Sequence, residues 1–391
     1  MPTFIRNIIN NTRGDRVIWA VVFILSIFSL LAVYSSTGTL AYKYQGGNTE
    51  YYLFKHLIIL LMGLFLIYIT HLIKFTYFSR IFQIALYIAI PLLVITLFAG
   101  LNLNEARRAL QLPFNLTFQT SDLAKLTLIL YLARVLSHKG LDIKNFKTAA
   151  LHLYLPSLII CALIFPANFS TAAILFSISI LLMYIGGVRT KHILSFTGIT
   201  ALLLVLAVLT GLAFPKVLPR TETWTNRIAI FFDAGEAGKE DAYQVEQSKI
   251  AIASGGIFGK APGNSTQRNF LPHPYSDFIF AIIVEEYGLA GGAFMVLMFL
   301  ILFFRVVRIT ARSPRNFGAL MVFGVGFSLV FQAMINMAVA VNLLPVTGQP
   351  LPLVSMGGTS IWFTSISIGI ILSVSKETEK KEANEQQPAT A

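Results

Sequence analysis

Residues 271–304 read LPHPYSDFIFAIIVEEYGLAGGAFMVLMFLILFF, and this stretch decides the fold. A long polar and charged segment precedes it, and an apolar run at 278–304 follows Asp277. A membrane-spanning helix needs about 20 mostly apolar residues, so the run is long enough to cross a bilayer. Asp277 stands where the chain enters the membrane, and Glu285 and Glu286 lie within the run. Ionisable groups at such depth are costly in lipid, which makes them candidate functional residues.

The composition indicates an integral membrane protein. Of the 391 residues, 55% are hydrophobic and 12% are charged, whereas about a quarter are charged in soluble domains. Lys and Arg on cytoplasmic loops explain the net charge of +12 better than nucleic-acid binding does. The single cysteine, Cys161, can form no internal disulfide. The sequence has no P-loop, no dinucleotide-binding glycine pattern, no HExxH and no Cys/His metal cluster, so the machinery of ATP-driven transport is absent.

Apolar runs along the chain predict an all-α polytopic membrane protein with about ten transmembrane helices. The run at 123–136 is the weakest, because it reaches spanning length only with Asp122 and Lys125 inside it. The ten runs are residues 17–34, 57–73, 81–99, 123–136, 149–165, 171–188, 193–214, 278–304, 317–340 and 359–374.

Basic residues in alternate short loops set the predicted orientation. Because Lys and Arg stay on the cytoplasmic side, both termini are predicted to be cytoplasmic. Residues 215–277 are then one large extracytoplasmic loop, and Asp277 faces outward. Residues 1–375 form the transmembrane domain, and the Lys/Glu/Gln-rich residues 376–391 are expected to be a disordered cytoplasmic tail.

Asp277 has two interpretations from the residues alone. Ser276 is a good N-cap for the helix that follows, which would place Asp277 in the first turn. The positive end of a helix favours a carboxylate there and keeps it ionised, as a general base must be. Capping alone would also explain an aspartate at this position, and the pattern does not decide between the two.

The long outer loop contains two further features. Polar and apolar residues at helical spacing over 243–252, followed by Gly255 and Gly256, predict an amphipathic helix with a glycine stop that could rest in the membrane interface. Residues 259–268 then form a glycine-rich turn that contains Lys260 and Arg268. Such a turn can bind phosphate through backbone amides and fixed charge, or it can be a plain surface turn.

Two segments elsewhere could line a binding site. Asp122 and Lys125 are three residues apart and share a helix face, so they either satisfy each other or form a cationic floor for an anionic ligand. Residues 342–360 hold three prolines and three glycines that no helix can continue. An apolar segment of this kind is either an outer turn or a re-entrant loop buried at a binding site. Glu285 and Glu286 could be structural or could form a proton relay, which would suggest a transporter.

Three segments together resemble one family. They are residues 263–288, with Asp277 followed by Phe-Ile-Phe-Ala; residues 118–125, from Phe-Gln to Leu-Ala-Lys; and residues 344–360, from Leu-Pro to Gly-Gly-Thr-Ser. In this order, on a chain with ten spans, they resemble the SEDS family of cell-wall polymerases, typified by FtsW, RodA and SpoVE. The Gly-Asn-Ser-x-Gln-Arg run at 263–268 is more similar to the FtsW and sporulation members than to RodA.

The resemblance implies a peptidoglycan glycosyltransferase that polymerises lipid II, the undecaprenyl-pyrophosphate disaccharide-peptide, into β-1,4 glycan strands with inversion. It implies that Asp277 is catalytic and that Lys125 lines the cavity below it. Arg107, Lys125, Lys260 and Arg268 are candidates to balance the pyrophosphate charge, and a divalent cation, Mg²⁺ or Mn²⁺, could share that task. The complete set of substrate-binding candidates is Arg107, Gln119, Lys125, Lys260, Asn264, Ser265, Arg268, Ser355, Gly357 and Gly358.

The chain departs from the family pattern at a few positions. His273 replaces a glutamate, Tyr275-Ser276 replaces His-Thr, and Ala109 replaces a tryptophan after the arginine pair. These changes put auxiliary roles in doubt and leave Asp277 in place. The identity of any metal is left open.

The resemblance also implies a setting. The protein would be a multi-pass protein of the bacterial cytoplasmic (inner) membrane with an extracytoplasmic active site. Its partners would be membrane lipid, a class B penicillin-binding protein transpeptidase and other divisome proteins, with no nucleic acid. The alternatives are a RodA-type elongation polymerase, a lipid II flippase or other transporter, and a non-catalytic scaffold.

Overall fold

The computed structural model describes residues 14–103, 106–112, 116–213, 221–232, 239–313 and 316–386. Within these residues the chain is almost entirely helical, and eight helices are long and apolar enough to cross a membrane. They are α2 (Arg16–Ser36), α4 (Thr49–Leu72), α5 (Phe75–Ala99), the continuous α7 (Phe146–Ala149), η2 (Ala150–Tyr154) and α8 (Leu155–Ile164), α10 (Thr190–Ala213), α13 (Ile279–Arg312), α14 (Asn316–Ala340) and α15 (Gly358–Gln386).

The two remaining predicted spans are also helices, and each has a reason for its weaker signal. The first, α9 (Phe169–Ile185), is apolar and has 17 residues. The second, α6 (Thr120–Ser137), carries Asp122, Lys125 and Arg134. It packs against α5, α9 and α14, so its charged residues are covered by protein instead of lipid. A helix therefore stands at each of the ten predicted runs.

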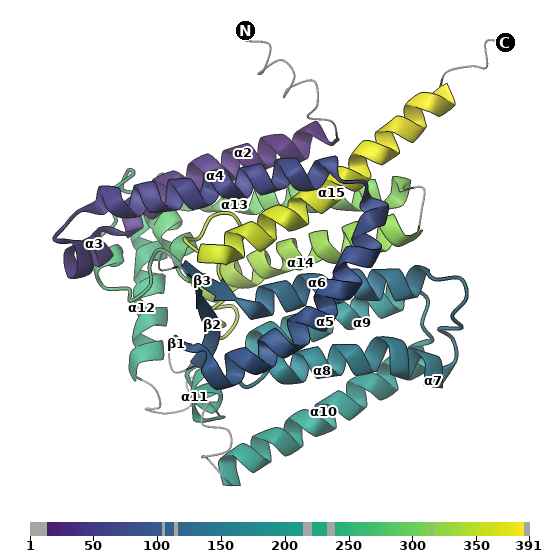
Figure 1. Cartoon of the computed structure of the whole chain (residues 1–391). Coiled ribbons are helices and arrows are strands. Elements are labelled where there is room, and N and C mark those ends of the chain that lie inside the picture. The colour runs from purple at the N-terminus through teal and green to yellow at the C-terminus, as the bar shows by residue number, and fades with distance from the viewer. Residues whose placement is uncertain are drawn as a thin grey trace.

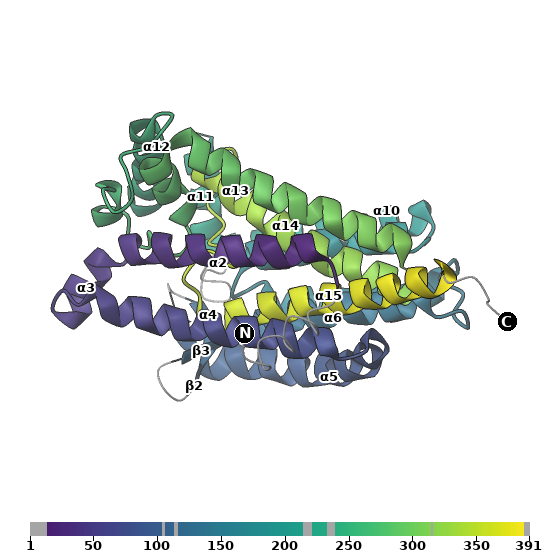
Figure 2. The same ribbon diagram turned by 90° about the horizontal axis from the view of Figure 1, so that it is seen from above.

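The long helices pack side by side in a bundle. Figure 2 shows α15 and α6 between α13 and α14 on one side and α4 and α5 on the other. Small residues allow α15 to approach α4 closely, since a Cβ atom on Gly63 would lie 2.7 Å from the Ser365 Oγ. Helix α10 lies at the edge of the bundle (Figure 1). Most of its side chains are exposed.

The two ends of the bundle differ. At one end the start of α2 meets the later part of α15, where the Asp15 amide donates to Ser375 Oγ at 3.0 Å and the Gly14 amide donates to Glu379. At the other end Figure 1 places the connecting elements: α3 (Gly38–Gln45), α11 (Thr221–Phe231), α12 (Lys239–Gly255) and three strands. The predicted helix at 243–252 is thus present within α12. It packs against α13, and Ser248 Oγ donates to the carbonyl of Ala340 at 2.7 Å.

The outer connection at 100–121 contains a sheet that the sequence did not predict. β1 (Leu101–Leu103), β2 (Ala106–Leu112) and β3 (Leu116–Gln119) form an antiparallel sheet in the order β1-β2-β3. Ala109 pairs with Gln119 and Leu112 pairs with Leu116. β2 packs on α5 and β3 packs on α15, so the sheet closes one end of the bundle.

The expectation of a disordered tail from residue 376 is wrong for most of its length. α15 continues to Gln386, and only residues 387–391 lie outside the described part. Lys and Glu are strong helix formers, so a charged composition does not by itself end a helix. Arg312 pairs with Glu382 at 3.4 Å, which ties this extension to the end of α13.

Candidate active site

Asp277 lies in a turn that precedes α13, here called the Asp277 turn (residues 272–278). The first turn of α13 contains no acidic residue, because the helix begins at Ile279 and its N-cap is Phe278. The prediction that Ser276 caps the helix and that Asp277 lies in its first turn is therefore wrong. Ser276 Oγ instead donates to Asp277 Oδ1 at 2.9 Å. Prolines at 272 and 274 keep this segment out of a regular helix.

Residues 341–357, here called the proline loop, join α14 to α15 and lie against the Asp277 turn. They have no regular secondary structure, and their side chains at Leu351, Val354 and Ser355 are buried. The prediction of irregular backbone that is buried in protein is confirmed. Ser355 Oγ donates to the Ser276 carbonyl at 2.6 Å, and the Met356 amide donates to the Tyr275 carbonyl at 2.9 Å.

Gly348 lies in the part of the proline loop beside the Asp277 carboxylate. Its φ of +64° lies in the left-handed region that favours glycine. A Cβ atom built at this position would lie 3.6 Å from Asp277 Oδ2 and 4.0 Å from Arg108 Nη1. The Asp277 carboxylate and the Arg108 guanidinium therefore both lie within 4.0 Å of the position that a side chain at residue 348 would take. A glycine keeps that position free of side-chain atoms.

Arg108 is a site residue that the sequence did not predict. It lies on β2, and its guanidinium lies beside Gly348. This proximity depends on the strand at residues 106–112, which was not predicted. The side chain of Arg107 lies outside the described part, and its role stays a prediction.

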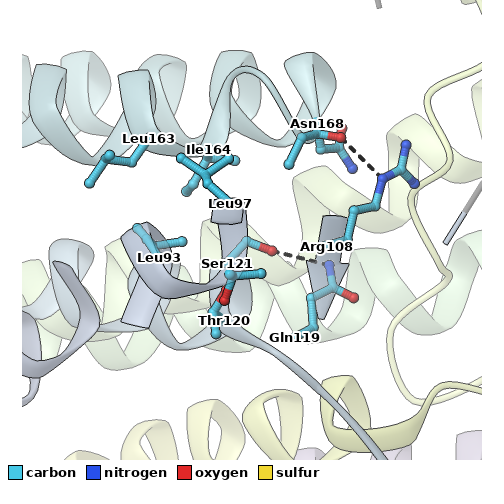
Figure 3. Close-up of a pocket in the computed structure, with 11 residues that line it drawn as sticks. Leu93, Leu97, Arg108, Gln119, Thr120, Ser121, Leu163, Ile164 and Asn168 are labelled. Atoms are coloured by element: carbon cyan, nitrogen blue, oxygen red, sulfur yellow. Dashed lines mark hydrogen bonds between the residues drawn. The ribbon is translucent and has the colours of Figure 1, made fainter. Parts of the chain in front are cut away.

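Arg108 and Gln119 line a small pocket between α5, α8 and the strands (Figure 3). Arg108 Nε donates to the Ala167 carbonyl at 3.1 Å, and Gln119 Nε2 donates to Ser121 Oγ at 3.2 Å. The opposite side of the pocket is apolar and is formed by Leu93, Leu97, Leu163 and Ile164. The pocket thus joins a cation and amide groups to a hydrocarbon surface.

Lys125 lies among α6, α14 and α15, beneath the proline loop. Its Nζ is 3.4 Å from Asp122 Oδ1 and donates to Gln332 Oε1 at 2.8 Å. Gln332 in turn donates to the Pro350 carbonyl at 2.9 Å. A cavity here is also lined by Ser328, Ser360, Thr364 and Ser367. Lys125 therefore reaches the site through the proline loop, and both interpretations of the Asp122–Lys125 pair remain compatible with this geometry.

Four of the predicted binding residues lie where β3, the proline loop and α15 meet. The Gln119 amide donates to Thr359 Oγ1 at 3.2 Å, and a Cβ on Gly358 would lie 3.3 Å from the Thr117 carbonyl. Gly357 is half-buried beside Ser360. Ser355 accepts a hydrogen bond from the Leu351 amide at 2.8 Å besides donating to Ser276, so its hydroxyl is occupied in shaping the loop.

Glu285 and Glu286 are buried, with exposed fractions of 0% and 1%, and form a separate glutamate cluster with the turn at 259–268. Glu285 accepts from Lys260 Nζ at 2.7 Å, from Ser265 Oγ at 2.5 Å and from the Thr266 amide at 3.1 Å. Glu286 accepts from the Ser35 hydroxyl and from the Ser265 amide. The glycine-rich turn does bind anions through amides and a lysine, and those anions are carboxylates of the same chain.

The remaining predicted residues of this turn belong to the same cluster. Arg268 Nη1 donates to the Ser35 carbonyl at 2.9 Å, and Asn264 Nδ2 donates to the Lys260 carbonyl at 3.1 Å. None of the hydrogen bonds described for Lys260, Asn264, Ser265 or Arg268 reaches the Asp277 turn. Their arrangement supports a structural role for Glu285 and Glu286, and substrate binding by these four residues stays a prediction.

The polar residues beside Asp277 include one group with a shifted pKa. Burial raises the pKa of the Tyr275 hydroxyl above its ordinary value, and repulsion from Tyr52 and from the Asp277 carboxylate raises it further. The hydroxyl lies 3.3 Å from His273 Nδ1. Within the described residues no group of three or more His, Cys, Asp or Glu side chains could hold a metal ion, so the divalent cation stays open.

Comparison with known proteins identifies the family of this chain. Residues 15–380 match the model of the FtsW, RodA and SpoVE family, which is described as a family of cell cycle proteins. The chain belongs to this family. Among its FtsW/RodA/SpoVE relatives, a probable peptidoglycan glycosyltransferase FtsW of Coxiella burnetii is 30% identical over 371 residues, covering 92% of this chain and 96% of the relative.

Solved structures share the fold. One, reported for the structural coordination of polymerization and crosslinking by a peptidoglycan synthase complex, has a TM-score of 0.69 at 24% identity and covers 93% of this chain and 98% of that one. The rod shape determining protein RodA of Thermus thermophilus has a TM-score of 0.65 at 23% identity, with 93% and 97% covered. The chain is thus a multi-pass membrane protein with the helical fold of this family.

Proposed function

We propose that this protein is a peptidoglycan glycosyltransferase of the FtsW type, which polymerises lipid II into glycan strands. The observation that carries the proposal is that the Asp277 carboxylate and the Arg108 guanidinium both lie beside Gly348, at the end of the bundle that holds the large loop. An anion and a cation on either side of the reacting groups suit a reaction that needs a base and that produces a charged leaving group. The name of the Coxiella relative supports the same chemistry.

In the proposed reaction Asp277 takes the proton from the 4-hydroxyl of the acceptor sugar. The freed oxygen attacks C1 of the donor sugar while the bond from C1 to the pyrophosphate oxygen breaks, so the α-linkage becomes a β-1,4 linkage. Undecaprenyl pyrophosphate leaves with the electron pair of that bond. Arg108 offsets the charge that develops on the leaving group, and fixed donors of this kind act most strongly where water is excluded.

The pocket of Figure 3 suits one part of such a substrate. Its apolar side, with Leu93 and Leu163, can contact the first units of a polyprenyl chain, while Arg108 and Gln119 can contact the pyrophosphate. We place Lys125 one step further away, because it contacts Gln332 and through it the Pro350 carbonyl. Its proposed role is to set the shape of the proline loop.

The setting follows from the same proposal. The protein would lie in the cytoplasmic membrane with Asp277 on the outer side, and would act with a class B penicillin-binding protein that cross-links the new strands. The solved synthase complex joins polymerization to crosslinking, which supports such a partner. A division role is favoured over elongation by the name of the Coxiella relative, and depletion would distinguish them by producing filaments or round cells.

The test is polymerisation of labelled lipid II by the purified protein with its partner transpeptidase. We expect Asp277→Asn to lower the rate by about 10²-fold or more, as loss of a general base does. Equal rates for Asp277→Asn and wild type would refute the assignment of the base. Transfer of lipid II across vesicles by a protein that forms no polymer would favour the transporter instead.

A further inference from the structure

Asn336 contacts both halves of the site from α14. Its Nδ2 donates to the Asp277 carbonyl at 2.9 Å and to the Gln349 carbonyl at 2.7 Å. The side chain is 1% exposed. The side-chain amide of Asn336 therefore links the Asp277 turn to the proline loop. Its partner on the loop is Gln349, the residue that follows Gly348.

The two partners fix the orientation of this amide. Both are carbonyl oxygens, which only accept, so the NH₂ group must face them and Oδ1 must face away. Asn336 Oδ1 is buried without a hydrogen-bond partner among the described residues. A buried acceptor without a partner lowers stability. A leucine would remove this unpaired acceptor, but it would also take the amide donors away from the carbonyls of Asp277 and Gln349.

We propose that Asn336 is a positioning residue for Asp277, an inference that rests on the proposed function. By holding the carbonyls of Asp277 and Gln349 together, it fixes the Asp277 carboxylate relative to Gly348 and to Arg108 beyond it. Reacting groups must be held within about 0.5 Å of their productive geometry. A carboxylate released from this link would meet the acceptor hydroxyl in fewer encounters, while the substrate would bind as before.

Thr171 on α9 provides a matched control, because it contacts the same loop. Gln349 Nε2 donates to Thr171 Oγ1 at 2.7 Å, so Thr171→Val also removes a hydrogen bond from the proline loop. Thr171 has no described hydrogen bond to the Asp277 turn. The comparison of Asn336→Leu with Thr171→Val separates a loosened loop from a misplaced base.

The experiment measures initial rates of polymerisation against lipid II concentration, together with thermal unfolding, for wild type, Asn336→Leu, Thr171→Val and Asp277→Asn. We expect Asn336→Leu to lower kcat by about 30-fold, within the range that a small misplacement causes. KM should stay within about threefold of wild type, since uniform binding is kept. Thr171→Val should keep its kcat within about threefold of wild type.

Results that differ from these expectations would overturn either the positioning role or the proposed function. Equal losses of kcat in Asn336→Leu and Thr171→Val, or an Asn336→Leu enzyme as fast as wild type, would overturn the positioning role while Asp277→Asn stays inactive. An active Asp277→Asn enzyme would overturn the proposed function itself. If Asn336→Leu does not purify as folded protein, Asn336→Asp decides, because it keeps the side-chain size and removes the amide hydrogens; wild-type kcat in that variant contradicts the proposal.

Discussion

The Asp277 turn and the glutamate cluster each hold a carboxylate beside a cation, and the carboxylates of the two regions lie within ten residues of each other in the chain. The two regions differ in the number of hydrogen bonds that their carboxylates accept. Glu285 is fully buried and accepts hydrogen bonds from Lys260, from hydroxyls and from backbone amides. Asp277 is half-buried and lies beside Gly348, and the one hydrogen bond described for its carboxylate comes from Ser276. A saturated carboxylate stabilises a fold, whereas a carboxylate with free acceptor capacity can take a proton.

The largest expected effect on stability belongs to the glutamate cluster. Glu285→Gln removes the charge that matches Lys260 and leaves loop donors without full partners, which should lower the free energy of unfolding by about 3 kcal/mol. Thermal unfolding in detergent checks this value. The polymerisation rate per folded molecule should stay within about threefold of wild type. A rate loss as large as that of Asp277→Asn would show that the two regions are not separate in function.

The next effect concerns the cation beside Asp277. Arg108→Ala should lower the polymerisation rate by about 30-fold, as expected for loss of a charge that stabilises the leaving group. Arg108→Lys should recover only part of the rate, because an ammonium cannot reproduce the planar fork of a guanidinium. Rates and melting temperatures measured together check this prediction. Full activity of Arg108→Ala would remove Arg108 from the site.

A substitution at Gly348 tests whether the position beside Asp277 and Arg108 must stay free of side-chain atoms. Gly348→Ala places a methyl group 3.6 Å from Asp277 Oδ2 and strains a backbone at φ +64°, which should cost about 1–2 kcal/mol of stability. Gly187→Ala is the matched control, since its φ is +89° and nothing lies within 4 Å of the new atom. Both variants should lose similar stability in thermal unfolding, and only Gly348→Ala should lose polymerisation, by about tenfold. Equal rates for the two would mean that the space beside Asp277 is not used.

The smallest effect is a dependence on pH at Tyr275. Because its pKa is raised in the folded state, stability is complete below the ordinary value of 10.0 and is lost as pH rises through that value toward the raised one. Tyr275→Phe should therefore lose less stability than wild type between about pH 8 and about pH 10.5, by a few tenths of a kcal/mol. Unfolding midpoints at the two pH values check the difference. Identical losses would mean that Tyr275 titrates normally.

Much of the fold could be predicted because hydrophobic runs report directly on membrane helices. Even α6 was found at 123–136, although Asp122 and Lys125 weaken its signal, since the rest of the helix is apolar. The sheet at 101–119 was missed because its short strands lie in a segment that is not long enough or apolar enough to span. The helical end of α15 was missed because a composition rich in Lys and Glu is shared by disordered tails and exposed helices.

The site was predictable where one residue carries the chemistry and less so where contacts decide it. Asp277 and the buried proline loop follow from ionisable and helix-breaking residues at membrane depth. The place of Arg108 in the site depends on the strand β2, which was not predicted, and the pairing of Lys260 with Glu285 depends on contacts between residues 25 positions apart. The sequence pattern of 259–268 left phosphate binding and a plain surface turn open, and the structure shows that the turn binds the carboxylates of Glu285 and Glu286.

One crossed measurement separates the two regions most directly: polymerisation rate and melting temperature, determined side by side for Asp277→Asn and Glu285→Gln. We expect Asp277→Asn to keep the melting temperature of wild type and to lose about 10²-fold or more in rate. We expect Glu285→Gln to show the reverse, with a lower melting temperature and a rate per folded molecule close to that of wild type. An Asp277→Asn protein that polymerises lipid II at the wild-type rate would contradict the catalytic role of Asp277.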